Sequence, residues 1–510
     1  MLAQISSLSL NGLNVNQIKV EIDASLGLPS WDIVGLPDTA VKESKERVKS
    51  AIKNSGYEFP TRKIVVNLAP ADIKKEGPNF DLPIAIAILV ATGQILPEKI
   101  SDFYFIGELG LDGTLRKSKG ALSFSLFLKH TKAKLIVPKE NGYEASMGGC
   151  LTYAFNDLKE IVHFFNTDNP VQPLVMPNFL DLQNNAQETA IDFSDIKGQY
   201  EAKRALEIAA AGGHNIILIG SPGSGKTMLA RALPSIMPPL TFEESLEVTK
   251  IYSVTGLLDK DLPLITKRPF RAPHHSSSQA SLIGGGRIPM PGEISLSHHG
   301  ILFMDEFPEY RKDVLEALRQ PLEDGIVTVS RVSAQHTYPC RFLLVASMNP
   351  CPCGFLNDPK KPCTCSSSAI NRYQRKISGP LLDRLDLQIE VTPVHFSDLH
   401  QAKQEESSSD IRQRVIQARN IQLKRFANKK IYNNSQMSSA EIKTYCTYDE
   451  MGKVLLERAF DKLGLSARAY HRILKIARTI ADLDNKPTIE SHHLSEAIQY
   501  RSLDKKIWQV

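Results

Sequence analysis

The residues best suited to chemistry follow a short apolar run, HNIILIG, that ends at Gly220. A buried strand, a glycine-rich loop, a lysine and a threonine together form the P-loop pattern, in which backbone N–H groups and the start of a helix face phosphate oxygens. We expect the Lys226 ammonium to bind the β- and γ-phosphates of ATP and the Thr227 hydroxyl to bind Mg²⁺. The predicted nucleotide-binding residues are Gly220, Ser221, Pro222, Gly223, Ser224, Gly225, Lys226 and Thr227.

Two apolar segments further along the chain end in polar residues. Ile301 to Met304 is followed by Asp305 and Glu306, and Arg341 to Ser347 is followed closely by Asn349. A carboxylate at a strand tip beside a P-loop can complete the Mg²⁺ shell, and its neighbour can polarise the attacking water. We therefore predict that Asp305 binds Mg²⁺, that Glu306 is catalytic and that Asn349 orients the water. The complete P-loop upstream disfavours a purely structural role for the two acids.

Four cysteines are packed into the short segment NPCPCGFLNDPKKPCTC. Their pattern is C-x-C, nine residues, C-x-C, at Cys351, Cys353, Cys363 and Cys365. Four thiolates in one loop suit tetrahedral Zn²⁺, which would lower the cost of ordering the loop. The spacing departs from the usual C-x₂₋₄-C, so free thiols or a redox pair remain alternatives. We predict structural zinc in a loop that holds the active-site surface between subunits.

Composition and charge narrow the class of protein. The chain has 510 residues, 42% of them hydrophobic and 23% charged, which is typical of a folded protein with several domains. The net charge of +5 permits a polyanionic partner without arguing for one. No apolar run reaches membrane-spanning length, the start lacks a signal-peptide pattern, and the seven cysteines do not form a secreted disulfide framework. We expect a cytoplasmic protein with no membrane partner.

The order of expected elements predicts a multidomain α/β fold. Residues 1–165 alternate strands and helices, a polar stretch at 166–187 is the expected linker, 188–395 form a second α/β domain, and 396–510 are wholly helical. Elements expected in the first domain are strands at 18–22, 63–68, 104–108 and 133–138 and helices at 42–55 and 82–92. The helices expected at the end of the chain are 411–426, 439–445, 449–463, 467–483 and 489–501.

The motif order resembles a known class of ATPases. Gly198-Gln199, Asp305-Glu306, Asn349 and the segment GPLLDRLD at 379–386 look like the AAA+ fold, in the helix-2-insert clade shared by magnesium-chelatase motor subunits and MCM helicases. The resemblance implies that Arg384 is a finger that reaches into the neighbouring subunit's site, a contribution worth about 10³ or more in rate. A surface salt bridge is the alternative role for this arginine.

The same resemblance implies a role for a second arginine. The segment LSARAYHRILKIARTIADL, at 465–483, is similar to the sensor-2 helix of that clade. The resemblance implies that Arg468 contacts the γ-phosphate. Arg472 is the alternative, because it lies one helical turn further on a similar face.

Two insertions lie between these motifs. The segment at 268–300 looks like the helix-2 insert, and the segment at 325–339 resembles the hairpin that precedes the third strand. In hexameric relatives both project toward a central pore, where arginines would suit a phosphate backbone without sequence readout. The candidate arginines are Arg268, Arg271, Arg287 and Arg331, and solvated loop charge is an equally open alternative. The His pairs 274/275, 298/299 and 492/493 are interpreted as polar surface or supporting residues rather than metal ligands.

The first domain resembles a Lon-type protease domain without its catalytic residues. GPNFDLPIAIA, at 77–87, aligns with the stretch that carries the Lon nucleophilic serine, and Asn79 occupies that place. The expected lysine falls at Leu122. Because a Ser–Lys dyad needs both groups, we predict a proteolytically inactive binding or assembly module.

Over its whole length the chain resembles the YifB/ComM family of magnesium chelatase-like, competence-associated ATPases. The segments that carry this resemblance are SWDIVGLPDTAVKESKERVKSAIKNSG, VNLAPADIKKEGPNFDLPIAIAILVATGQ, RPFRAPHHSSSQASLIGGG and NPCPCG. The resemblance implies a homo-hexameric DNA helicase that promotes branch migration, with DNA and recombination proteins as partners. Rival interpretations are a chelatase-type or protein-remodelling motor, an ATP-dependent protease, and an ATP-gated scaffold.

Overall fold

The computed structural model describes most of the chain as two compact units. Described are residues 2–167, 171–184, 191–259, 262–286, 289–331, 334–356, 358, 361–393, 405–427, 429, 431–463 and 466–501. Unit 1 comprises Met1–Ala186 and Thr241–Thr266, and unit 2 comprises Gln187–Leu240 and Lys267–Val510. Each unit has its own hydrophobic core. Among the described helices, none is both long and apolar enough to cross a membrane.

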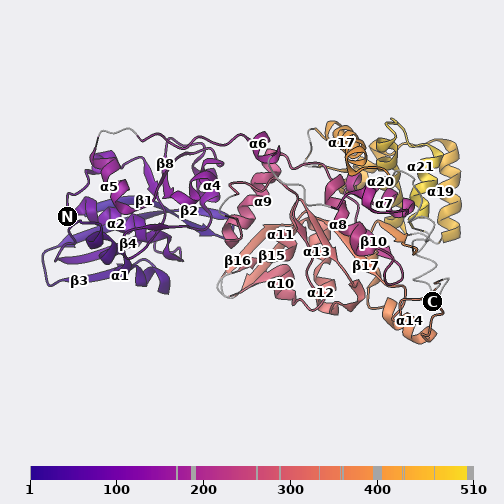
Figure 1. Ribbon diagram of the computed structural model, residues 1–510, viewed down its shortest axis with the longest axis horizontal. Helices are drawn as coiled ribbons and strands as arrows, with labels where there is room; N and C mark the ends of the chain where they lie inside the picture. Colours follow the sequence, from indigo (N-terminus) through magenta and orange to yellow (C-terminus); the bar gives the residue numbers. More distant parts are fainter. Residues whose placement is uncertain are drawn as a thin grey trace. The chain divides into compact units, whose positions relative to one another are not determined.

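Unit 1 is built on a seven-stranded mixed sheet in the order β3-β4-β2-β1-β5-β8-β9 (Figure 1). Its strands are β1 (Leu2–Asn11), β2 (Asn14–Ser25), β3 (Ser30–Val34), β4 (Lys63–Ala69), β5 (Phe103–Phe105), β8 (Lys134–Pro138) and β9 (Leu151–Phe155), with a small pair β6 (Glu108–Leu109) and β7 (Leu115–Arg116) beside them. Burial alternates along β2, as the predicted half-buried strand requires.

Several helices accompany this sheet. They are α1 (Thr39–Asn54), α2 (Asp81–Ala91), α3 (Ala121–Leu128), α4 (Gly142–Ser146), α5 (Leu158–Asn166), α6 (Phe179–Asn184) and α9 (Phe242–Thr255), with 3₁₀ turns at Pro78–Phe80, Pro97–Lys99 and Lys139–Asn141. The last of them in the sequence, α9, packs against α3. Nearly every residue of α2 is buried, because it packs between β1, β2 and α1. Its first residue, Asp81, is fully buried and accepts a 2.7 Å hydrogen bond from Arg47 Nε of α1.

Helix α9 belongs to unit 1 although it follows the P-loop helix in the sequence. The chain leaves unit 2 after Leu240, starts α9 at a capping box formed by Thr241 and Glu244, and returns at Lys267. Phe242 packs on Phe179 of α6 with ring centroids 5.5 Å apart. Residues 188–395 therefore do not form one continuous domain as expected, because 241–266 belong to unit 1.

Unit 2 contains a parallel sheet in the order β11-β14-β17-β10-β18. The strands are β10 (Ile216–Ile219), β11 (Phe270–Arg271), β14 (Ile301–Met304), β17 (Leu343–Met348) and β18 (Leu387–Glu390). The three central strands are buried along their whole length, which explains their continuous apolar sequences. In open parallel sheets ligands bind beyond the carboxyl ends of the strands, and this is the edge at which the predicted motifs lie.

The helices next to this sheet are mostly short. They are α7 (Tyr200–Gly212), α8 (Lys226–Ile236), α10 (Gln279–Ile283), α11 (Glu293–Leu296), α12 (Lys312–Ala317), α13 (Arg319–Asp324), α14 (Ser367–Gln374) and α15 (Gly379–Leu382), with 3₁₀ turns at Phe193–Asp195 and Phe307–Glu309. Two small hairpins accompany them, β12 (Gly284–Gly285) with β13 (Met290–Pro291), and β15 (Ile326–Arg331) with β16 (Ala334–Pro339).

The C-terminal part of unit 2 is helical, as predicted. Its helices are α17 (Ser408–Arg425), α18 (Ser439–Tyr445), α19 (Glu450–Leu463), α20 (Ala467–Leu483) and α21 (Ser491–Gln499), with a 3₁₀ turn at Asn434–Gln436. Helices α17 and α20 pack against α7, and α17 also packs against α8, so this helical part is joined to the sheet region through α7 and α8 (Figure 1). Buried charge on α20 is paired, since Asp482 accepts hydrogen bonds from Arg425 at 2.8 Å and from Arg478 at 3.1 Å.

Candidate nucleotide site

The P-loop is formed where β10 ends and α8 begins. Gly223 and Gly225 have φ values of 79° and 93°, in the left-handed region that favours glycine. Gly225 is the N-cap of α8, so the free N–H groups of the first turn of that helix face the loop. This arrangement is compatible with the anion binding that the sequence predicts.

Lys226 lies between the P-loop and the tip of β17. Its Nζ donates to the carbonyls of Gly220 at 2.7 Å and Ser221 at 2.9 Å, and to Asn349 Oδ1 at 3.3 Å. Burial lowers the pKa of Lys226, and the negative charge of Asp305 opposes that shift. Strand register explains the contact with Asn349. Ile219 of β10 pairs with Met348 of β17, so Asn349 lies beside Gly220, the first residue of the P-loop.

Asp305 and Thr227 meet at the predicted Mg²⁺ position. Thr227 Oγ1 donates to Asp305 Oδ2 at 3.0 Å, and the Ser347 hydroxyl donates to the other carboxylate oxygen. In the parallel pair of β14 and β17, Met304 is opposite Ala346, which places Ser347 beside the following aspartate. A hydroxyl and a carboxylate are oxygen ligands of the type that Mg²⁺ prefers, so these two side chains fit the ion.

Glu306 directly follows Asp305, and the residue that contacts its carboxylate lies in the segment at 268–300, which is predicted to be the helix-2 insert. Glu306 has a left-handed backbone with φ of 51°, and its carboxylate Oε2 lies 3.1 Å from His275 Nδ1. Tyr310 Oη donates to the Pro273 carbonyl at 2.5 Å. Burial raises the pKa of Tyr310, and the charges of Asp305 and Glu306 act in the same direction. The first segment of the insert therefore contacts the carboxylate that we predict to be catalytic.

Arg384 follows α15 and is engaged within its own chain. Its guanidinium pairs with Glu323 of α13 and donates to the Pro380 carbonyl at 2.6 Å. Its own carbonyl accepts a 3.1 Å hydrogen bond from Asn215 Nδ2. The ion pair expected under the alternative interpretation is thus present in the single chain, and the finger role stays a prediction about the assembly.

The two candidate arginines of α20 have different surroundings. Arg468 is exposed in the first turn of the helix. Arg472 Nη1 lies 3.3 Å from Asp386 Oδ1, and His214 Nδ1 lies 3.4 Å from Oδ2 of the same carboxylate. Although burial acts to raise the pKa of Asp386, the Arg472 guanidinium and the His214 ring lower it to about 2. Arg472 is therefore part of a largely buried ion pair, and the contact of Arg468 with the γ-phosphate stays a prediction.

We expect Arg472→Ala to lower the free energy of unfolding by about 3 kcal/mol, because it removes the cation that most stabilises the charge of the buried Asp386 carboxylate. Arg468→Ala should change it by less than about 0.5 kcal/mol, as at other exposed positions. The depressed pKa of Asp386 means that its stabilisation is present above about pH 4 and is lost as the pH falls toward about 2. Denaturant unfolding of both variants at neutral pH checks the expected difference in stability, and equal losses of unfolding free energy would contradict it.

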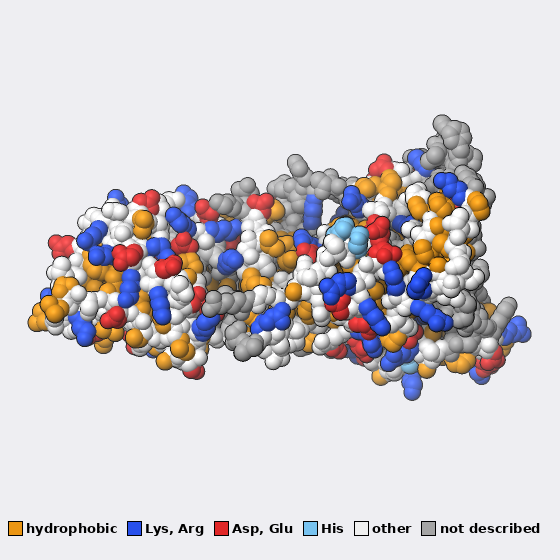
Figure 2. Space-filling model, turned by 90° about the horizontal axis from the view of Figure 1, so that it is seen from below, with side chains coloured by type: hydrophobic (Ala, Val, Ile, Leu, Met, Phe, Trp, Pro, Cys, Tyr) orange, Lys and Arg blue, Asp and Glu red, His pale blue; other side chains and the backbone are white. Residues whose placement is uncertain are grey.

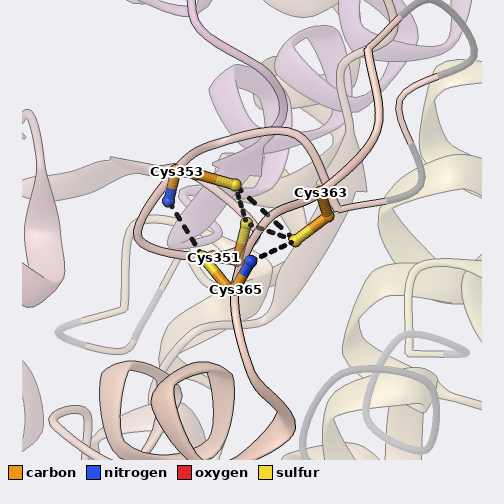
Figure 3. Close-up of side chains that lie close together, drawn as sticks. All are labelled: Cys351, Cys353, Cys363 and Cys365. Atoms are coloured by element: carbon orange, nitrogen blue, oxygen red, sulfur yellow. Dashed lines mark hydrogen bonds between the residues drawn. The ribbon is translucent and has the colours of Figure 1, made fainter.

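The four clustered cysteines converge on one point (Figure 3). Sγ–Sγ distances are 3.4 Å for Cys351–Cys353, 3.7 Å for Cys351–Cys363 and 3.6 Å for Cys353–Cys363. The backbone N–H of Cys353 donates to Cys365 Sγ at 3.4 Å. The four sulfurs all lie within 4.8 Å of one another, which suits a metal ion. Sequence spacing therefore identified a real side-chain cluster.

The predicted DNA-contacting arginines divide into two kinds. Arg268 donates to the carbonyls of Pro238 and His299 at 2.6 Å each, and Arg271 forms two hydrogen bonds with Glu293 at 2.6 and 2.7 Å. Both thus hold the insert in place. Arg331 is exposed at the end of β15. Arg287 lies outside the described residues.

Two residues at the site, Ser347 and Asp358, were not found by sequence reasoning, and His275 was given only a general role. Ser347 precedes the third motif and could have been found by aligning the two parallel strands. His275, interpreted as a surface or supporting residue, lies 3.1 Å from the Glu306 carboxylate that we predict to be catalytic. Asp358, whose Oδ2 accepts a 2.8 Å hydrogen bond from Ser221 Oγ, gave no signal in the sequence.

Family profiles match three parts of the chain. Residues 192–399 match the family described as Magnesium chelatase, subunit ChlI. Residues 20–141 match Subunit ChlI of Mg-chelatase, and residues 405–501 match Magnesium chelatase, subunit ChlI C-terminal. The first of these matches covers the P-loop, both other strand-tip motifs and the cysteines.

Some individual relatives match nearly the whole chain, and others match a shorter part. Competence protein ComM of Haemophilus influenzae is 43% identical over 507 residues, 98% of each chain. The Escherichia coli protein YifB, described as uncharacterized, is 44% identical over 498 residues, 97% of this chain and 96% of its own. The Magnesium-chelatase 67 kDa subunit of Chlorobaculum parvum is 30% identical over 166 residues, 31% of this chain and 23% of its own. The profiles, the strand order and the full-length identity together show that this chain belongs to the YifB/ComM family of magnesium chelatase-like AAA+ proteins.

Proposed function

We propose that unit 2 hydrolyses ATP and that the protein is a motor. The observation that carries this proposal is the convergence of Lys226, Asp305 and Asn349 at the carboxyl ends of three neighbouring parallel strands. Lys226 would bind the β- and γ-phosphates, Glu306 would accept the proton of the attacking water, and Asn349 would orient that water. Mg²⁺, held by Thr227 and Asp305, would offset the charge of the phosphates.

We further propose that the motor acts on DNA, as a homo-hexameric helicase that promotes branch migration in recombination and natural transformation. Support comes from the relative named a competence protein, which matches over 98% of this chain. A ring would complete each ATP site with Arg384 of the neighbouring subunit and would line a pore with the insert and the β15–β16 hairpin. Recombination proteins are the partners that such an activity would require.

The insert at 268–300 and the β15–β16 hairpin contact each other. Tyr338 Oη of β16 donates to the Pro289 carbonyl of the insert at 2.7 Å. A Cβ at Gly285 would lie 2.9 Å from Arg331 Nη2, so the insert backbone lies directly against the hairpin arginine. Figure 2 shows Lys and Arg side chains interspersed with Asp and Glu over the visible face of the molecule. Charge on this face therefore does not single out a DNA surface, and the part of the proposal that draws on the structure depends on Arg331 and the contacts around it.

Arg331→Gln should reduce DNA stimulation of ATP turnover toward a ratio of one, because the phosphate contact that it supplies is lost. Phosphate contacts make binding fall steeply with salt, so the slope of log K against log salt should decrease by about 1 per subunit. Turnover is measured with and without forked, three-strand and four-way DNA across a salt series. Arg458→Gln, at an exposed arginine of α19, is the matched control. If no DNA substrate changes the ATP turnover of the unaltered protein, the helicase proposal is contradicted.

A chelatase-type or protein-remodelling motor without DNA translocation is the second candidate. The observation that favours it is the match to the Magnesium-chelatase 67 kDa subunit, which covers 31% of this chain. In either case we propose that unit 1 binds or assembles rather than cleaves protein. Asn79 and Leu122 occupy the positions at which the Lon-type resemblance expects the serine and the lysine, and Leu122 is fully buried.

A further inference from the structure

The cysteine loop, defined as the described residues of 351–365, lies against the P-loop, and its sulfurs fit a metal. We propose that it binds one Zn²⁺ per chain and that the metal-bound loop holds the P-loop in its nucleotide-binding shape, so that zinc and ATP bind cooperatively. The proposal rests on the proposed function only in that the P-loop binds ATP.

The sulfur geometry fits zinc. Four Zn–S bonds of about 2.3 Å in a tetrahedron place the sulfurs about 3.8 Å apart. The distances between the sulfurs of Cys351, Cys353 and Cys363 are 3.4 to 3.7 Å, so only small shifts are needed. Each thiol that becomes a ligand releases one proton to solvent, and the complex of four thiolates with Zn²⁺ carries two net negative charges.

Backbone groups of the loop support the thiolates. The N–H groups of Cys353 and Cys365 donate to Cys365 Sγ at 3.4 Å and Cys363 Sγ at 3.5 Å. Gly354 turns the chain between the first two ligands and the rest, with φ of 85° and its N–H bonded to the Cys351 carbonyl at 3.0 Å. These hydrogen bonds stabilise negative charge on sulfur, which is what a zinc ligand set requires.

Two contacts join this loop to the P-loop. Asp358 Oδ2 accepts a 2.8 Å hydrogen bond from Ser221 Oγ, while its Oδ1 accepts a 3.0 Å hydrogen bond from the Lys361 N–H. The carboxylate is therefore fixed within the loop and reaches the P-loop at the same time. At Gly354 a Cβ would lie 2.5 Å from Pro222 Cδ and 3.7 Å from Asn349 Cγ. The loop backbone thus lies directly against the P-loop and next to the polar tip of β17.

A thermodynamic consequence follows from these contacts. Metal binding orders the cysteine loop, and the ordered loop fixes Ser221 and Pro222 before the nucleotide arrives. If zinc raises the affinity for ATP by some factor, ATP must raise the affinity for zinc by the same factor. Coupling of this kind is commonly about 5- to 150-fold, and we expect about tenfold here because two direct contacts carry it.

The first test is the metal content of the full-length protein purified without added metal. We expect one zinc per chain by elemental analysis, and none after Cys351→Ser with Cys353→Ser. Cys446→Ala, at a buried cysteine of unit 2 outside the cluster, is the control and should retain one zinc. Should the double variant fail to fold, titration of the unaltered protein with a thiol reagent and a zinc indicator gives the same answer. If the protein contains no zinc, or contains another metal in its place, the proposal is wrong.

The second test is the coupling. The dissociation constant of a non-hydrolysable ATP analogue should rise about tenfold when zinc is removed by a chelator, and adding Zn²⁺ back should restore it. Asp358→Ala should keep the zinc but weaken nucleotide binding, whereas Asp358→Asn, which can still accept from Ser221 Oγ, should bind nearly as the unaltered protein does. Unchanged nucleotide affinity after zinc removal overturns the coupling. Failure of the helicase proposal would differ, because nucleotide would still bind with zinc-dependent affinity while DNA had no effect on turnover.

Discussion

Glu306→Gln is expected to bind ATP but to hydrolyse it about 10³-fold more slowly, since a general base contributes about 10²- to 10⁴-fold. The amide has the size of the carboxylate but cannot accept a proton from water. Lys226, Thr227 and Asp305 are untouched by this change, so nucleotide binding should persist. Lys226→Ala should behave differently and weaken nucleotide binding itself, because its ammonium lies within the P-loop.

The measurement separates binding from chemistry. Nucleotide affinity is determined at equilibrium, and the chemical step is determined by single-turnover hydrolysis with excess protein. Glu309→Gln is the matched control, because Glu309 lies three residues further on and pairs with Lys376 at the surface. The control should retain most of its turnover. Turnover of Glu306→Gln equal to that of the unaltered protein would remove this residue from the proposed mechanism.

The parts of unit 2 that sequence could predict are those in which local pattern and topology agree. A parallel sheet buried on both faces needs continuous apolar strands, and such strands are visible in the sequence before the P-loop, Asp305 and Asn349. Since the strands are parallel and adjacent, their carboxyl ends meet, and the three motifs meet with them. The five predicted C-terminal helices begin and end within three residues of the observed ones, because their apolar spacing and caps are local signals.

The sequence alone could not identify contacts between residues that lie far apart along the chain. Arg268 and Arg271 had the charge expected of a phosphate contact, but charge alone does not reveal that Glu293 and backbone carbonyls already bind them. Asp358 had no pattern around it, and its role depends on a contact with Ser221 that is 137 residues away. The packing of α9 in unit 1 depends on surfaces such as Phe179, in a stretch whose composition predicted a linker.

Arg384→Ala is expected to lower ATP turnover in assembled rings by about 10³-fold, the usual contribution of an arginine finger. In the single chain Arg384 pairs with Glu323, whose side chain is 60% exposed. A pair with so exposed a carboxylate contributes about 1 kcal/mol or less after solvent screening, so moving the arginine to a phosphate costs mainly its hydrogen bond to the Pro380 carbonyl. Glu323→Gln separates the two roles. It should retain most of the turnover if Arg384 is a finger, and should lose as much as Arg384→Ala if the ion pair is what matters.

Mixing experiments then test whether the arginine acts across subunits. Arg384→Ala and Lys226→Ala proteins should each be inactive, because one lacks the finger and the other lacks its own phosphate contact. In mixed rings some interfaces join an intact P-loop to an intact finger from the neighbour, and partial turnover should return. Turnover should depend on the mixing ratio and reach its maximum near equal amounts, since the number of mixed interfaces is then largest. If rings verified as mixed recover no activity, Arg384 acts within its own chain, and its pair with Glu323 becomes the better account of its function.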